Sequence, residues 1–242
     1  MTDYSHIHPL ILEKSDRSRV GKQLLAIAKD YLGEGMATAK VLDVGCAGGT
    51  ITSLLAPQVG QIIGIDPDKP AIEFARHHYR RKNLRFEVAD ALKLPRGGER
   101  FDLVICNQVY EFVANDVKLM SEIHRVLRPG GVCLFGGRNR WTLMEAQYNL
   151  PLLSWFPPSI AQLILSIVRP GTTYVGRYRG YFSLRQLCRR FGIIDYTPII
   201  LADPEHFGFH KLARMKLLTK IGALLYGVMA PMVPNYLWIL RK

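Results

Sequence analysis

The sequence has few cysteines, no long apolar run and no recognisable leader. Its four cysteines are scattered and form no Cys-x-x-Cys pair, a pattern that predicts reduced thiols and no metal site. No apolar stretch reaches the roughly 18–20 residues that a membrane-spanning helix needs. The first ten residues, MTDYSHIHPL, lack the basic and then apolar order of a signal peptide. We therefore expect a cytoplasmic protein.

Acidic residues are scarce in the last two fifths of the chain. Residues 138–242 contain 14 Lys and Arg against 4 Asp and Glu, whereas residues 1–137 contain 18 against 16. The formal net charge of +12 therefore comes almost entirely from the C-terminal part. This imbalance favours an anionic partner there, such as a lipid surface, a phosphorylated substrate or nucleic acid; a solvated basic surface is the alternative.

Strand-like runs alternate with helical patterns through the first half of the chain. Hydrophobic residues make up 48% of the 242, enough for a full core in one large domain or in one domain with a substantial insertion. The stretches 50–58, 69–81 and 116–128 have helical spacing. Runs rich in Val, Ile and Leu predict strands at 40–45, 61–66, 84–90, 101–107 and 132–137. The alternation predicts a parallel sheet covered by helices on both faces.

The pattern changes after Gly137. Residues 138–181 are aromatic, interrupted by prolines and irregular, apart from an apolar helical piece near 159–168. Farther on, we expect a helix over 183–192 with Ser183 as its N-cap, and a strand over 193–202. A helix over 210–229 and a final strand over 235–242 complete the prediction.

A glycine loop, VLDVGCAGGT at 41–50, leaves the first predicted strand and enters a helix. Such a turn needs glycine where φ is positive or where a ligand passes close to the backbone. Ala47 takes the second glycine position of the dinucleotide fingerprint G-x-G-x-x-G, which makes a pyrophosphate ligand less suitable. Asp43 lies inside the strand, and a buried carboxylate there requires hydrogen-bond donors or a cationic ligand.

Acidic residues also follow the next two strands. Asp66 ends the second strand, where an acid accepts bonds from both ribose hydroxyls of a bound nucleoside. Asp90 and Ala91 follow the third strand, where an adenine would lie. A single Asp at the end of a strand is more often a cap. Together, at the ends of successive strands, they predict a nucleoside-binding edge.

These motifs resemble those of a known family. VLDVGCAGGT, IIGIDPD, FEVADALKLP, FDLVICNQVYEFV and HRVLRPGG are similar, in order, to the motifs of class I S-adenosylmethionine-dependent methyltransferases, most closely the type 11 group that modifies small molecules and lipids. The resemblance covers roughly residues 20–137. It implies a Rossmann-like α/β fold: a seven-stranded, mostly parallel sheet with an antiparallel last strand. It also implies one domain over 1–242, with substrate-side or lid insertions at 138–182 and 203–234.

The resemblance further implies S-adenosylmethionine as cofactor and no metal. Asp43, Gly45 and Gly48 would then line the methionine moiety. Asp66 would hold the ribose, and Asn107 would lie near the transferable methyl group. The adenine would contact the pair Asp90 and Ala91.

The stretch CNQVYEFV, at 106–113, is where cofactor and acceptor would meet. In many relatives the corresponding motif ends Glu-His-Val, but here Phe112 replaces the histidine, so no general base carries over. Glu111 either acts in the site or begins the following helix, and Tyr110 either lines an acceptor pocket or packs on the sheet. Two further candidate bases, His206 and His210, lie in a segment that overhangs the active site in this fold or forms a polar loop. His6 and His8 stay unassigned.

The basic and apolar residues of the C-terminal segment indicate a candidate membrane partner. Four basic residues between 211 and 220 precede an apolar run at 221–233, too short to span a membrane but suited to an anionic membrane surface. The alternatives are a lid or a dimer interface. We therefore expect a methyltransferase for a small-molecule, lipid-like, lipid-linked or glycan-type acceptor, cytoplasmic or peripheral at the membrane. An RNA methyltransferase or a non-catalytic binding protein of the same fold is the alternative, and a nucleic-acid partner is disfavoured.

Overall fold

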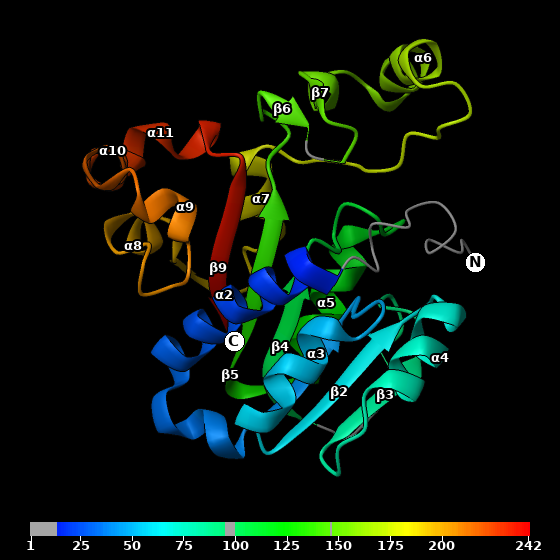
Figure 1. Cartoon of the computed structure of the whole chain (residues 1–242), viewed down its shortest axis with the longest axis vertical. Helices are drawn as coiled ribbons and strands as arrows, with labels where there is room; N and C mark the ends of the chain where they lie inside the picture. Colours follow the sequence, from blue (N-terminus) through cyan, green and yellow to red (C-terminus); the bar gives the residue numbers. More distant parts are fainter. Residues whose placement is uncertain (1–13, 95–99, 146) are drawn as a thin grey trace.

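A seven-stranded sheet forms the centre of the protein (Figure 1). The computed structural model describes residues 14–94, 100–145 and 147–242. Within these residues the sheet order is β3-β2-β1-β4-β5-β9-β8, and β9 runs antiparallel to both of its neighbours. The predicted sheet and its reversed last strand are therefore confirmed. The strands are β1 (Lys40–Val44), β2 (Gln61–Asp66), β3 (Leu84–Val88), β4 (Phe101–Asn107), β5 (Leu127–Arg138), β8 (Gly192–Asp195) and β9 (Asn235–Arg241).

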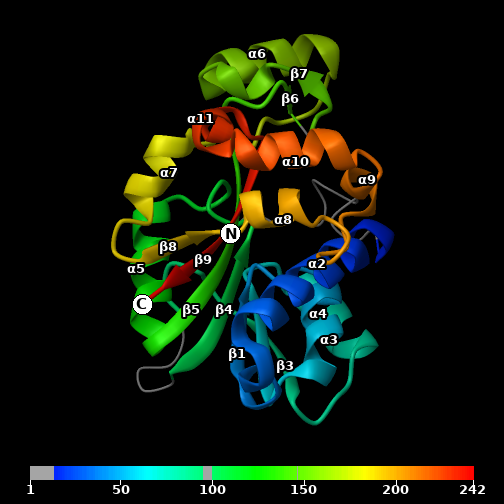
Figure 2. The ribbon, with the colours of Figure 1, turned by 90° about the vertical axis from the view of Figure 1, so that its left-hand side faces the viewer.

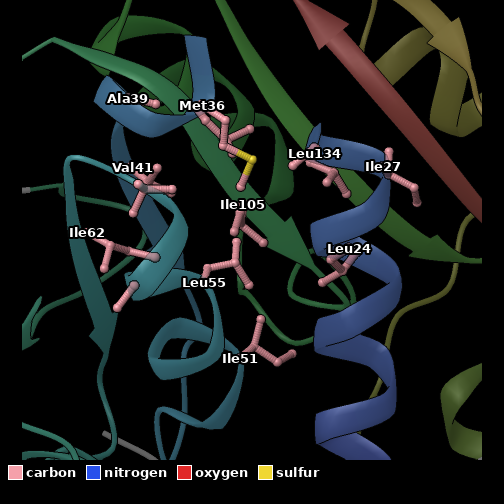
Figure 3. Packing of buried hydrophobic residues seen from close by; sticks show 14 of the residues in the cluster. Leu24, Ile27, Met36, Ala39, Val41, Ile51, Leu55, Ile62, Ile105 and Leu134 are labelled. Carbon is pink, nitrogen blue, oxygen red and sulfur yellow. The ribbon is translucent and has the colours of Figure 1, made fainter. Parts of the chain in front are cut away.

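Helices cover both faces of the sheet (Figure 2). One face carries α2 (Lys14–Leu32), α3 (Thr50–Leu55), α4 (Lys69–His78) and α8 (Thr197–Ala202). The other carries α5 (Asp116–Val126) and α7 (Tyr181–Leu187). Neighbouring residues of β1 explain the two cores: Val41 packs against the first group of helices and Leu42 faces the second. Figure 3 shows Leu24 and Leu55 meeting strand residues in the first core.

Two further segments lie beyond the carboxyl ends of the central strands (Figures 1 and 2). The first contains the short hairpin β6 (Met144–Glu145) and β7 (Leu150–Pro151) and the helix α6 (Pro158–Val168). The second contains α9 (His210–Ala213), α10 (Lys216–Leu224) and α11 (Tyr226–Met229). The 3-10 turns are η2 (Gly33–Thr38), η3 (Ala56–Gln58), η4 (Leu153–Trp155) and η5 (Ala230–Met232).

The strand predicted over 193–202 is wrong in its second half. β8 ends at Asp195, and residues from Thr197 form α8 instead. Pro198 lacks the N–H that a sheet ladder requires but is tolerated in the first turn of a helix. Asp195 accepts a bond from the Thr197 backbone N–H at 2.9 Å, and Ile200 of α8 is buried in the core.

Three predicted helices also differ in their ends. Ser183 is not an N-cap: α7 begins at Tyr181, and the Ser183 hydroxyl accepts a bond from Arg179 at 2.8 Å. The helix over 116–128 stops at Val126 because Leu127 already pairs with β4. The helix over 210–229 is divided into α9, α10 and α11. Its glycines weaken a continuous helix, and the Tyr226 hydroxyl fixes the segment to Asp195 at 2.7 Å.

Candidate functional site

A cavity of about 460 Å³ lies at the carboxyl ends of β1, β2 and β4. Six of the seven residues predicted to contact the cofactor line it, and Gly48 does not. The six are Asp43, Gly45, Asp66, Asp90, Ala91 and Asn107. Parallel strands end at the same edge, so one sheet brings these distant residues together. A second hollow, of about 780 Å³, lies along β3 among exposed basic side chains such as Arg80 and Arg85.

The glycine loop folds so that its backbone supports the cavity. Gly45 and Gly49 both have positive φ, at 74° and 76°, which glycine adopts without strain. Ala47 is also left-handed, with φ of 47°. Its N–H donates to an Asp66 carboxylate oxygen at 2.9 Å, so the residue that departs from the fingerprint connects the loop to β2.

The Asp66 carboxylate is held rigidly at the end of β2. One oxygen accepts from Ala47 N–H and the other from Asp68 N–H, each at 2.9 Å. Burial raises the pKa of Asp66, and the two backbone bonds oppose that shift. Each oxygen keeps a second lone pair, because a carboxylate has about four acceptor positions. A vicinal diol is the ligand group that suits such a pair of oxygens.

Asp43 and Arg17 form the polar floor of the cavity. Asp43 is buried, and Thr52 donates to its carboxylate at 2.6 Å; burial raises its pKa to about 7. Arg17 of α2 also lines the cavity, where burial lowers its pKa while Asp43 and Asp66 oppose that shift. Sequence reasoning missed Arg17, since an arginine in the helix before the first strand carries no motif.

The far end of the cavity is formed by the ends of β4 and β5. Asn107 packs directly over Gly136, where an added Cβ would lie 1.9 Å from the Asn107 amide oxygen. Gln108 is left-handed at φ of 56°, and its N–H donates to the Gly136 carbonyl at 2.7 Å. Its side chain accepts a bond from Arg138 at 3.1 Å. Gln108 and Arg138 both line the cavity, and sequence reasoning singled out neither.

Tyr110 lies beside this end but does not line the cavity. Its ring is 1% exposed; its hydroxyl donates to the Arg138 carbonyl at 2.5 Å and accepts from the Arg179 N–H at 3.2 Å. Burial raises the pKa of Tyr110, so the phenol stays protonated. These contacts make Tyr110 a connection between β4, β5 and residue 179.

Glu111 lies beside the cavity and is 1% exposed. Among the described residues, neither carboxylate oxygen has a hydrogen-bond partner. Burial raises its pKa to about 7, and the nearby charge of Arg138 opposes that shift. A carboxyl with this pKa is half ionised near neutral pH.

The two candidate histidines lie elsewhere. His206 is exposed, and its Nε2 lies 3.7 Å from the Asp30 carboxylate of α2. His210 begins α9, and neither histidine lines the cavity. The stretch around Gly208 packs against α2, where Gln23 donates to the Gly208 carbonyl at 3.2 Å, and no residue from 203 to 210 lines the cavity. His6 and His8 lie outside the described residues.

All four cysteines are buried and unpaired, as the sequence indicated. No group of three or more His, Cys, Asp or Glu in the described part of the chain is arranged to hold a metal ion. Over the same residues, the structure contains no helix with the length and apolar character for crossing a bilayer.

Comparison with known proteins gives related sequences and folds. Residues 42–135 match a family model described as a methyltransferase domain. A ubiquinone biosynthesis O-methyltransferase of Coxiella burnetii is 29% identical over 132 residues, which cover 51% of this chain and 56% of the relative. The chain thus spans about half the length of the curated relatives that it matches.

Solved structures extend the likeness to nearly the whole chain. The plantazolicin methyltransferase BpumL, in complex with a monoazolic desmethylPZN analog and SAH, has a TM-score of 0.59 at 16% identity, with coverage of 99% of this chain and 88% of that one. A putative sarcosine dimethylglycine methyltransferase from Galdieria sulphuraria has a TM-score of 0.57 at 17% identity, with coverage of 91% and 84%. At these identities the likeness establishes the fold.

Proposed function

Because residues 42–135 match a methyltransferase family model and the fold is that of solved methyltransferases, we propose that the chain is a class I S-adenosylmethionine-dependent methyltransferase that transfers the methyl group of S-adenosylmethionine to a small-molecule acceptor. The observation that carries the proposal is the convergence of Asp43, Asp66, Asp90 and Asn107 on one cavity at the strand ends. When bound, the cofactor supplies an activated methyl group, so the protein has to align the acceptor and exclude water.

The residues present suit this cofactor. The Asp66 carboxylate, held by two backbone N–H groups, has the acceptors for a ribose diol. Asp90 directs one carboxylate oxygen to Leu92 N–H at 2.8 Å and keeps acceptor capacity for an exocyclic amine. Asp43 suits the ammonium group of a methionine moiety, and Arg17 suits its carboxylate.

The proposed activity is tested by titrating the protein with S-adenosylhomocysteine in a calorimeter. We expect a micromolar or tighter dissociation constant, and methylation of a small-molecule fraction from cells supplied with labelled S-adenosylmethionine. Absence of binding would contradict the proposal and favour a non-catalytic protein of the same fold. Transfer to RNA alone would contradict the choice of acceptor.

We also propose a lipid-like acceptor. Val109, Phe112 and Val113, which follow β4, line the cavity and offer apolar contacts. We call the end of the cavity formed by β4 and β5 the acceptor end. The relative from Coxiella burnetii is named for ubiquinone biosynthesis, which supports the same acceptor class.

An anionic membrane surface is the partner that we propose for the C-terminal part. Leu224 and Val228 on α10 and α11 are 84% and 83% exposed, and Ile167 on α6 is 73% exposed. Figures 1 and 2 show these helices at the same end of the molecule. Further exposed apolar residues of these helices are Ile160, Leu163, Val168, Leu217, Leu218, Ile221 and Met229.

Charge supports a bilayer over a protein partner for this surface. The sequence contains no Asp or Glu from 206 to 242 or from 146 to 194. Lys211, Arg214, Lys216 and Lys220 accompany the apolar side chains of α9 and α10. Basic residues near an anionic leaflet contribute roughly 1 kcal/mol each, which adds to the burial of apolar groups in the interface.

Co-sedimentation with liposomes tests this partner. We expect binding to vesicles that contain phosphatidylglycerol, and little to vesicles of phosphatidylcholine alone. The double substitution Leu224→Glu and Val228→Glu should weaken binding by about tenfold or more, because it replaces apolar contacts by repelled charges. Val117→Glu is the matched control, since Val117 is 63% exposed on α5, away from this surface. Equal sedimentation of both variants would rule out α10 and α11 as the contact.

A further inference from the structure

Two side chains of opposite charge, Glu111 and Arg138, lie at the acceptor end of the cavity with incomplete hydrogen bonding. Arg138 donates from Nη2 to Gln108, but its Nη1 is buried and has no hydrogen-bond partner among the described residues. Both carboxylate oxygens of Glu111 are also buried and have no hydrogen-bond partner within the described chain. The charge of Arg138 acts on Glu111, but no ion pair joins the two side chains in the described part of the chain.

The two arginines that line the cavity lie at opposite ends of it. Arg17 faces Asp43 and Asp66 at the cofactor end. Arg138 ends β5, beyond Asn107, and lines the cavity together with Gln108. Among the described lining residues, Arg17 and Arg138 are the cations. The acceptor end therefore carries a guanidinium whose compensating carboxylate, Glu111, lies behind it and outside the cavity.

Residues 177 and 178 cover the pair Glu111 and Arg138. The Arg177 N–H donates to the Glu111 carbonyl at 2.8 Å. Tyr178 lies close to Arg138, and its hydroxyl donates to Glu145 at 2.9 Å. The cover excludes water from Glu111 and leaves Arg138 reachable from the cavity. A buried charged group without its full set of hydrogen bonds costs roughly 1–3 kcal/mol or more, and such costs concentrate where a ligand completes the set.

We propose that Arg138 binds an acidic oxygen of the acceptor, a carboxylate or an ionised phenol or enol, and that Glu111 is a positioning residue that sets the net charge behind it. The proposal rests on the proposed function, because it names the acceptor class of that same site. A planar guanidinium recognises oxyanions through paired hydrogen bonds, and a low-polarity surrounding strengthens the contact. An acceptor that is ionised in this way does not require the histidine that Phe112 replaces.

The first experiment compares two probes of the same shape, benzoate and benzamide, by titration with and without S-adenosylhomocysteine. At about pH 6 we expect benzoate to bind the protein about tenfold tighter than benzamide, because a charged hydrogen-bonded pair replaces a neutral one. Arg138→Gln should abolish the difference, and Arg138→Lys should retain part of it. Equal affinities of the two probes for the unmodified protein would overturn the proposal.

The second experiment uses pH. Glu111 has a pKa of about 7 and, once ionised, offsets the charge of Arg138, so benzoate binding should weaken severalfold between about pH 6 and about pH 8. Glu111→Gln should reduce this decline, leaving only the part that Asp43 causes in both proteins, and should bind benzoate more tightly than the unmodified protein at the higher pH. A purely structural role of Glu111 would leave the decline unchanged, and that result would overturn the role of Glu111.

The comparison of Glu111→Gln with the unmodified protein separates the effect of Glu111 from that of other titrating groups. Tyr110 and Cys106 also face Glu111, but burial holds both pKa values above their usual range, so neither ionises in this interval. Asp43 has a pKa of about 7 at the other end of the cavity, and it is present in both proteins that are compared.

Binding of S-adenosylhomocysteine distinguishes failure of this inference from failure of the proposed function. Arg138→Gln should change the affinity for S-adenosylhomocysteine by less than about twofold, and a loss of about tenfold would assign Arg138 to the cofactor and overturn the proposal. Binding of S-adenosylhomocysteine without a preference for benzoate would reject this inference alone. A preference for benzoate without S-adenosylhomocysteine binding would reject the proposed function and leave an anion site.

Discussion

Replacing Asp66 by alanine is expected to weaken S-adenosylhomocysteine binding by roughly 10- to 150-fold, which corresponds to about 1.5–3 kcal/mol. The physical reason is the loss of a rigid carboxylate, the group that we propose as the acceptor for both ribose hydroxyls. Its rigidity comes from the two backbone donors, Ala47 and Asp68, that hold the oxygens at the end of β2. The measurement is calorimetric titration of the ligand at a temperature where the variant remains folded.

Two variants serve as controls for Asp66. Asp66→Asn keeps the shape and one acceptor oxygen but loses the charge. Its affinity for S-adenosylhomocysteine should therefore fall between those of the unmodified protein and Asp66→Ala. Glu73→Ala removes an exposed carboxylate of α4 that pairs with Lys69 and does not line the cavity, so it should bind normally. An Asp66→Ala protein with unchanged affinity would exclude Asp66 as the ribose ligand.

Gly49→Ala is expected to destabilise the protein by about 3 kcal/mol and to lower Tm by about 6–12 °C. Gly49 has φ of 76°, and an added Cβ would lie 2.6 Å from the Phe86 ring and 2.9 Å from the Ala75 Cβ. The substitution therefore carries both the cost of a left-handed residue and that of overpacking between the loop and the first core. Thermal unfolding followed by circular dichroism measures the change.

Gly171 provides the matched control for the contact. It has φ of 82°, but an added Cβ would have no neighbour within 4 Å. Gly171→Ala should therefore cost only the backbone strain, about 1–2 kcal/mol. If both substitutions lower Tm equally, the close packing of Gly49 against Phe86 does not contribute to stability.

The fold and six of the residues that line the cavity followed from short motifs in the sequence and from the family that these motifs resemble. Asp66 and Asp90 were identifiable because a parallel sheet brings successive strand ends to one edge, whatever else surrounds them. Gly45 was identifiable because a tight strand-to-helix turn requires positive φ. Gly48 was implied by the resemblance but does not line the cavity.

Residues that depend on distant segments were harder to place. His206 and His210 were candidate bases because connections after the sixth strand can overhang the site in similar folds, with a polar loop as the alternative. Here that connection packs on α2, so His206 meets Asp30 instead. Arg17 was missed for the converse reason: it belongs to the helix before the first motif, and only folding brings it beside Asp43.

The sequence by itself determined the order of strands and helices and the acids at the strand ends, because these depend on periodicity and on local turn geometry. The antiparallel last strand was implied by the resemblance of its motifs to a known family. Only the tertiary structure decided what surrounds CNQVYEFV. Tyr110 became a buried connection and Glu111 a buried carboxyl behind Arg138, because residues 177–179 fold back over the end of β4. Burial and charge in that contact join residues far apart in the chain, and the local pattern around 106–113 carries no information about them.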